Sequence, residues 1–311
     1  MAFLCGFGAW TPERVVANEE LAARLGCDAD WIFDVSGIRE RRYADESTTV
    51  VDLAVKAAED CLSRCRTDRS KIGMVIVSCG AAERRFPGPA AEVARRLELT
   101  DRPAIDLPMA SAGTLFGMAL AAQTAGACGD VLVIGAEKMS AVVDREPLDR
   151  NVAILFGDGA GACLVSQSGG KAEIADWILC SDGSFTDALK LDFGGHIAMN
   201  GLTVILQAAR KVPKVMKDLV RRNSVEPTAV DVYLMHQANQ NLIAKIARGL
   251  GVEASKFYSN IERFGNTSSA SMLIAAAEWA ERTGFRAGPV VFGAFGAGFH
   301  WGALLARPVA A

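Results

Sequence analysis

Residues 156–161 read Phe-Gly-Asp-Gly-Ala-Gly, and residues 292–298 read Phe-Gly-Ala-Phe-Gly-Ala-Gly. The two glycine-rich stretches lie in opposite halves of the 311-residue chain. Around each, apolar runs of strand length alternate with longer helical patterns, which is typical of buried, mostly parallel sheets. The same order of elements in both halves predicts an α/β fold with an internal duplication. We place the join between residues 166 and 171, so that 1–167 and 168–311 form the two halves.

Hydrophobic periodicity and chain breakers locate the expected elements. Strands are predicted at 72–79, 104–109, 131–136, 230–235, 290–294 and 301–306. Helices are predicted at 89–99, 112–127, 203–223, 240–249 and 268–283. We expect Pro213 to interrupt the helix that contains it, because proline lacks the N–H of a helical residue. The glycines at 157 and 159 predict a hairpin between 153–156 and 160–165.

Composition excludes several classes of protein. Half of the residues are hydrophobic and 22% are charged, which excludes a disordered chain. The net charge of -3 argues against a nucleic-acid-binding protein. The N-terminus lacks the basic start and apolar core of a signal peptide, and we expect no membrane span. The eight cysteines show no CxxC or zinc-ligand spacing, so they predict small buried side chains, a reducing cytoplasm and no metal.

Three segments contain residues suited to chemistry. Ser111 lies between a predicted strand and a predicted helix, where it is either a plain N-cap or a nucleophile whose anion the helix N-terminus stabilises. His236 follows a predicted strand, a place suited to proton or oxyanion chemistry in a crevice, although a lone histidine is more often structural. Asn266 begins a turn before a helix, where its amide either caps the helix or donates to an oxyanion.

Together with further motifs, these segments resemble β-ketoacyl-ACP synthase III, the initiating condensing enzyme of the thiolase superfamily. The resemblance spans nearly the whole chain and rests on Trp31 and on residues 36–42, 86–89, 155–161, 261–268 and 294–302. It implies a thiolase-like fold of two duplicated βαβαβαββ halves that form a five-layered αβαβα core. It also implies an acyltransferase that condenses an acyl-CoA primer with a malonyl thioester, with loss of CO₂, in fatty-acid or polyketide starter chemistry.

The family's catalytic cysteine, histidine and asparagine fall on Ser111, His236 and Asn266. The resemblance further implies that the amide of residue 111 and the turn at Gly296 and Gly298 form a second oxyanion hole. CoA thioesters are the implied substrates, and no cofactor is implied. The CoA-binding positions of the family fall on four residues of this chain: Trp31, Arg39, Arg150 and Asn239.

An acidic carrier protein is a possible partner, because residues 208–256 contain nine basic residues against four acidic ones. The family's docking arginine is Asn241 in this chain, and Lys214, Lys245 and Arg248 are the candidate replacements. An ordinary solvated helix face explains the same charges. The resemblance also implies a homodimer, in which residues 86–89 lie where the partner contributes to the acyl pocket.

Serine in place of cysteine leaves several functions open. A hydroxyl is far less acidic than a thiol and needs a general base, for which His236 is the candidate in the sequence. Ser111 is therefore native in a divergent synthase, or it is an engineered Cys→Ser trap, or the protein has another activity. The other activities are acyl transfer to a small nucleophile, decarboxylation of a malonyl thioester, and a non-catalytic role as partner subunit of a synthase.

Overall fold

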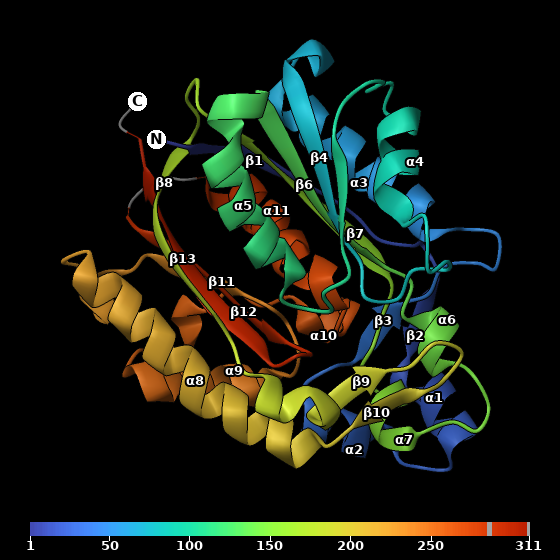
Figure 1. The fold of residues 1–311 in the computed structure, drawn as a ribbon. Coiled ribbons are helices and arrows are strands. Elements are labelled where there is room, and N and C mark those ends of the chain that lie inside the picture. Colours follow the sequence, from blue (N-terminus) through green and yellow to red (C-terminus); the bar gives the residue numbers. More distant parts are fainter. Residues whose placement is uncertain (285–287, 310–311) are drawn as a thin grey trace.

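The computed structural model describes residues 1–284 and 288–309 and contains one continuous nine-stranded sheet (Figure 1). Its strand order is β11-β12-β13-β8-β1-β7-β6-β4-β5. The strands from the first half are β1 (Phe3–Trp10), β4 (Ile72–Ser78), β5 (Ala104–Leu107), β6 (Asp130–Glu137) and β7 (Gly159–Ser166). Those from the second half are β8 (Ala172–Ser181), β11 (Val232–Met235), β12 (Val290–Gly296) and β13 (His300–Pro308).

The two groups of strands are joined by a short contact. Strands β1 and β8 pair only at Phe3–Glu173 and Leu4–Ala172, whereas β1 pairs with β7 along its length. The sheet is therefore two half-sheets that share one corner. A division at 167/168 would fall in the turn between β7 and β8, and it remains our proposal.

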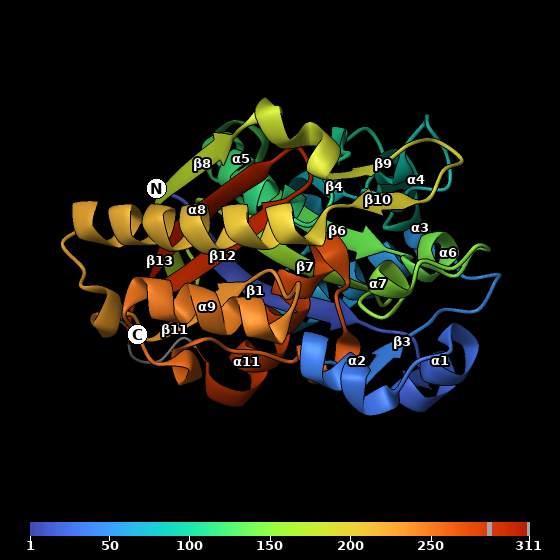
Figure 2. The ribbon, with the colours of Figure 1, turned by 90° about the horizontal axis from the view of Figure 1, so that it is seen from below.

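Helices cover both half-sheets and fill the space between them (Figures 1 and 2). α3 (Val50–Cys65) and α4 (Pro89–Arg96) pack on the outer face of the first half-sheet. α5 (Gly113–Cys128) and α11 (Ser271–Thr283) lie between the half-sheets. α8 (Gly201–Arg222) and α9 (Gln240–Leu250) pack on the outer face of the second. This arrangement confirms the predicted five layers.

The alternation of side chains in the strands produces these layers. In β4, Met74 and Ile76 face the central core, whereas Val75 and Val77 face the outer core under α3. Since both faces are buried, the strand reads as an unbroken apolar run. Small residues let α5 lie close to the sheet, because a Cβ on Gly117 would lie 2.9 Å from Cγ1 of Val133.

Smaller elements gather at one end of the molecule, on the right in Figure 2. They include two short two-stranded sheets, formed by β2 (Val15–Ala17) with β3 (Glu40–Arg42) and by β9 (Leu189–Leu191) with β10 (Ile197–Met199). The short helices are α1 (Asn18–Leu25), α2 (Ala29–Ser36), α6 (Ser140–Val143), α7 (Arg150–Ala153) and α10 (Ile261–Phe264). Of these elements, β9 and β10 line the cavities described below.

The structure corrects three predictions. The expectation of mostly parallel sheets is wrong, because only three of the eight strand pairings in the nine-stranded sheet are parallel, namely β11–β12, β4–β5 and β4–β6. The expected hairpin is wrong, because residues 150–153 form α7 and β7 pairs with β1 and β6. The expected interruption at Pro213 is also wrong, since α8 runs through it. The proline ring packs on α9 at Gly249, where a Cβ would lie 2.8 Å from Cγ of Pro213. The pattern also missed β1, β8 and α3.

Within the described residues, no helix combines the length and the apolar character that a membrane crossing requires.

Candidate active site

Ser111 lies in the turn between β5 and α5 and has a left-handed backbone, with φ of 66°. It is not an N-cap, because α5 begins two residues later at Gly113 and has no side-chain cap. Its backbone N–H donates to Oγ of Ser268 over 3.1 Å, and the two hydroxyl oxygens are 3.5 Å apart. The side chain is 6% exposed. The turn therefore holds the hydroxyl at the wall of a buried cavity, as a nucleophile requires.

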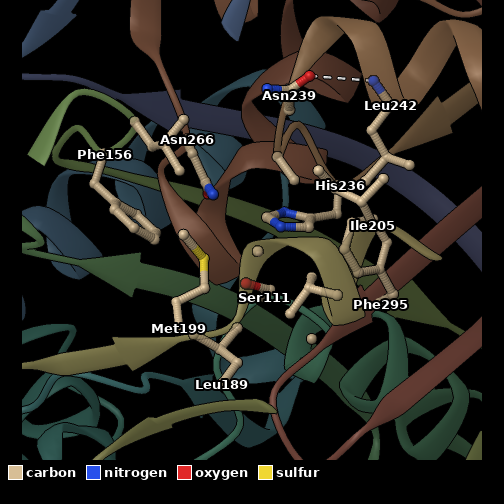
Figure 3. Close-up of a pocket in the computed structure, with 15 residues that line it drawn as sticks. Ser111, Phe156, Leu189, Met199, Ile205, His236, Asn239, Leu242, Asn266 and Phe295 are labelled. Atoms are coloured by element: carbon tan, nitrogen blue, oxygen red, sulfur yellow. Dashed lines mark hydrogen bonds between the residues drawn. The ribbon is translucent and has the colours of Figure 1, made fainter. Parts of the chain in front are cut away.

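Asn266 comes from the second half of the chain and is also buried. Its Oδ1 accepts the backbone N–H of Ser268 over 2.9 Å, which fixes the side-chain amide. Figure 3 shows the amide nitrogen directed toward the space between His236 and Ser111. The asparagine thus presents an N–H donor, as the oxyanion role requires.

His236 follows β11, and its ring faces the same space (Figure 3). Burial lowers the pKa of the imidazole to about 3, opposed by a hydrogen bond to the backbone of Ser268. The edge-to-face contact with Phe295, at 5.3 Å between ring centroids, contributes to this dry setting. The ring is therefore neutral at physiological pH, with one nitrogen protonated and the other free to accept.

Ser271 determines which nitrogen carries the proton. Nδ1 of His236 lies 2.7 Å from Oγ of Ser271, which also lies 3.0 Å from the carbonyl oxygen of Ser268. A hydroxyl has one proton. When Ser271 donates to the Ser268 carbonyl, Nδ1 is protonated and Nε2 is an acceptor. When it donates to Nδ1, Nε2 carries the proton and can stabilise an oxyanion.

Two cavities meet at Ser111. The first cavity has a volume of about 560 Å³, and the side chains of His236, Asn266 and Asn239 form part of its wall. The second has about 410 Å³ and is mostly apolar, lined among others by Ala81, Met139, Leu191, Ile197 and Ala297. Phe156 and Leu189 line both. The serine therefore stands between two mostly apolar cavities, and the side chains of His236 and Asn266 lie in the wall of the first.

Glu137, at the end of β6, is a buried charged residue that the sequence analysis missed. It accepts from Oγ of Ser268 over 3.0 Å and from Oγ of Ser269 over 2.8 Å. The N–H groups of Gly80 and Ala81 also donate to it. Burial raises its pKa, and these hydrogen bonds oppose the shift. An acidic residue at the end of an otherwise apolar strand was the available signal.

Gly296 directly contacts the turn that contains Ser111. A Cβ at this position would lie 2.2 Å from the carbonyl oxygen of Ala110 and 3.0 Å from Cβ of Ser111, so the contact requires glycine. Gly298 instead faces the ring of His300, and its φ is 122°. The Ser111 amide already donates to Ser268, so an oxyanion at this place would compete with that hydroxyl.

The four predicted CoA-binding residues lie in three local settings. The guanidinium of Arg150 lies 5.0 Å from the ring centroid of Trp31. Arg39 is exposed, lies over the ring of Phe33 and pairs with Glu262 over 2.6 Å. Asn239 caps α9, donates to the carbonyl of Val35 and lines the first cavity.

The three predicted carrier-docking residues are exposed. Lys214 on α8 pairs with Asp218 over 2.6 Å, and Lys245 and Arg248 lie on α9. Asn241 donates to the carbonyl of Asp34. In the part of the chain that the structure describes, no group of three or more His, Cys, Asp or Glu side chains is arranged to hold a metal ion.

Comparison with known sequences gives matches over nearly the whole chain. The family model described as 3-oxoacyl-[acyl-carrier-protein (ACP)] synthase III matches residues 105–183, and the model of its C-terminal part matches 220–307. The β-ketoacyl-[acyl-carrier-protein] synthase III of Aquifex aeolicus is 33% identical over 307 residues, 98% of each chain. Synthase III 1 of Vibrio parahaemolyticus is 34% identical over 315 residues, again 98% of each.

Comparison with solved structures agrees. The 3-oxoacyl-[acyl-carrier-protein] synthase III of Aquifex aeolicus superimposes with a TM-score of 0.93 at 32% identity, covering 99% of this chain and all of that one. A priming β-ketosynthase from the R1128 polyketide pathway gives 0.90 at 27% identity, covering 99% and 96%. The predicted thiolase-like fold is confirmed.

Proposed function

This chain belongs to the β-ketoacyl-ACP synthase III family of acyltransferases, and on that premise we propose that Ser111, His236 and Asn266 carry its chemistry. The family reaction is the decarboxylative condensation of an acyl primer with a malonyl thioester. The observation that carries the proposal is the meeting of these three buried side chains at one cavity. They come from segments far apart in the sequence.

In the first half-reaction, Oγ of Ser111 attacks the carbonyl carbon of an acyl-CoA. A C–O bond forms, the C–S bond breaks, and the serine proton is transferred in the end to the CoA sulfur. The N-terminus of α5, which begins two residues after Ser111, favours the developing negative charge. Because an ester is a weaker acyl donor than a thioester, we propose that the later transfer of the acyl group from Ser111 to the enolate is slower than it is from cysteine.

In the second half-reaction, a malonyl thioester loses CO₂ and its enolate carbon attacks the acyl-serine. The enolate oxygen accepts hydrogen bonds from Nε2–H of His236 and from the amide of Asn266. A neutral histidine suits this role, because its Nε2–H donates a hydrogen bond to the enolate oxygen while the ring itself carries no charge. The tautomer required is the one in which Ser271 turns its proton from the carbonyl of Ser268 to Nδ1 of His236.

The two cavities suggest how the substrate lies. We propose that the pantetheine arm occupies the first cavity beside Asn239 and that the acyl chain occupies the second, apolar one. Trp31 and Arg150 would hold the adenine, and Arg39 the phosphates. Each face-to-face contact needs about 3.5 Å. Since Arg150 lies 5.0 Å from Trp31, it must move outward to admit a base between them.

The protein partners of this chain are also proposals. We propose that an acyl carrier protein delivers the malonyl group and docks on Lys245 and Arg248, where exposed charge favours an acidic partner; Lys214 would take part only by leaving Asp218. We also propose a homodimer, because Phe86 is 85% exposed in the segment that the resemblance assigns to the partner's pocket. A cytoplasmic location without a cofactor stays a prediction of the sequence.

A mass measurement tests the proposed function. The protein is incubated with a panel of acyl-CoAs, and its intact mass is recorded, with peptide mapping of Ser111. An acyl adduct on Ser111, together with labelled CO₂ release from malonyl thioester and a β-keto product, supports the synthase. CO₂ release without condensation would instead identify a decarboxylase. The absence of both would identify a non-catalytic subunit.

A further inference from the structure

We propose that Ser268 and Glu137 form a proton relay that activates Ser111, with Ser268 as the first acceptor and Glu137 as the terminal base. The inference rests on the proposed function, because it explains how a hydroxyl can take the place of a thiol as nucleophile. A serine nucleophile needs a general base within hydrogen-bond reach, directly or through one intermediary.

The contacts of Ser268 set the direction of proton movement. Its hydroxyl donates to Oε1 of Glu137 over 3.0 Å. It accepts the backbone N–H of Ser111 over 3.1 Å, and Oγ of Ser111 lies 3.5 Å away. A hydroxyl offers one proton and two lone pairs. With its proton directed to the carboxylate, Ser268 has one lone pair left to accept the proton of Ser111.

Ser268 is held in this position from both sides. Its φ is 48°, in the left-handed region, and its own N–H donates to Oδ1 of Asn266 over 2.9 Å. It is 1% exposed. The residue therefore connects the oxyanion asparagine to the nucleophile with little freedom to turn away. The 3.5 Å separation is long, as catalytic contacts often are before substrate binds.

Glu137 has the properties of a base. Five groups donate to its carboxylate: the N–H groups of Gly80 and Ala81, the hydroxyls of Ser268 and Ser269, and the thiol of Cys79. They stabilise the anion, while complete burial raises the pKa of this carboxyl and makes it readier to accept a proton. Burial also raises the pKa of the Cys79 thiol, whose sulfur lies 3.6 Å from Oε2 of Glu137, so this thiol stays protonated.

His236 is the weaker candidate for this step. Burial lowers the pKa of its imidazole to about 3, so it accepts a proton less readily than an ordinary histidine. Its Nδ1 is also held by Ser271. The two buried groups therefore divide the work, Glu137 accepting the proton of Ser111 and His236 donating to the enolate.

The step balances without another reactant. As Oγ of Ser111 bonds to the acyl carbon, its proton moves to Oγ of Ser268, whose own proton moves to Oε1 of Glu137. The C–S bond then breaks, and the proton returns from Glu137 through Oγ of Ser268 directly to the thiolate sulfur of CoA, because Oγ of Ser111 is now part of the ester. The products are acyl-serine and CoA thiol, and Glu137 is again a carboxylate.

The test compares the same changes in two nucleophile backgrounds. Acetyl-CoA and hexanoyl-CoA are the probes, and rapid-quench mass spectrometry gives the acylation rate constant. With serine at position 111, Glu137→Gln and Ser268→Ala should each lower it by about 100-fold or more, the usual contribution of a general base. In Ser111→Cys the same changes should cost less than about fivefold, because a thiol ionises without a base. The dissociation constant for acyl-CoA should not change.

Ser269→Ala is the matched control. This residue donates to the same oxygen of Glu137 over 2.8 Å but makes no hydrogen bond to Ser111 in the structure. Ser269→Ala therefore measures the loss of one donor to Glu137 without loss of the relay, and acylation should fall by no more than about 10-fold, well short of the effect of Ser268→Ala. Ser268→Ala leaves four donors on Glu137, so it tests the relay even where Glu137→Gln folds poorly. Equal losses in the serine and cysteine backgrounds, or no loss with serine, would overturn the relay. A wild-type protein with no adduct at Ser111 would overturn the proposed nucleophile itself.

Discussion

The two halves of the chain each place one buried polar residue at the end of a parallel strand, before a helix. Ser111 follows β5 and precedes α5, and His236 follows β11 and precedes α9. Their surroundings differ. Ser111 is connected through Ser268 to the buried carboxylate of Glu137, whereas His236 contacts the neutral hydroxyl of Ser271 and the ring of Phe295.

The difference shows how one cavity can perform two kinds of chemistry. Burial raises the pKa of Glu137 and lowers that of His236, because it disfavours the charged form of each. The side of Ser111 therefore suits proton removal, and the side of His236 suits hydrogen-bond donation by a neutral ring. Groups whose environments shift their protonation in opposite senses commonly take separate acid and base roles.

Replacing Ser111 and His236 one at a time should have the largest effects, because each change removes the chemistry of one side of the cavity. Ser111→Ala should abolish the acyl adduct, because no oxygen remains to form the ester. His236→Ala should lower CO₂ release from malonyl thioester by about 100- to 1,000-fold, the usual cost of an oxyanion donor, while an adduct still forms on Ser111. Intact mass and labelled CO₂ measure the two steps. Loss of both steps in His236→Ala would contradict the division.

Removing the hydroxyl behind the histidine should have a smaller effect. Ser271→Ala leaves Nδ1 of His236 and the backbone N–H of Gln237 without this partner. A lost buried hydrogen bond costs about 1–3 kcal/mol, so CO₂ release should fall by about 10-fold or somewhat more. Ser269→Ala is the control, since it does not contact His236. An unchanged rate in Ser271→Ala would show that the ring is oriented by packing alone.

The smallest expected effect is on stability at low pH. The pKa of His236 is about 3 in the folded chain and about 6.5 when unfolded, so the unfolded state binds more protons between these values. The contribution of the neutral His236 ring to the free energy of unfolding is complete above pH 6.5. It is lost as the pH falls, by about 1 kcal/mol per pH unit. Urea unfolding of wild type and His236→Gln from pH 7 to 5 should show the stability of the wild type falling faster. Glu137, raised in pKa, has the opposite sign.

Much of the fold could be read from periodicity. The predicted strand at 72–79 and the helix at 112–127 agree with β4 and α5 within about one residue, because apolar runs and small-residue helices are local signals. Strands β1 and β8 were missed. β8 is only partly buried along most of its length, so its apolar pattern is weak.

The sequence by itself determined the class of fold and the family, and it predicted the three candidate residues Ser111, His236 and Asn266, because motifs and periodicity are properties of the chain. Only the tertiary structure decided what surrounds them. Glu137 is 131 residues from Ser268 in the chain, yet their side chains are 3.0 Å apart. Such a contact depends on how β6 and the turn before α11 pack, and long-range packing leaves no pattern in the local sequence.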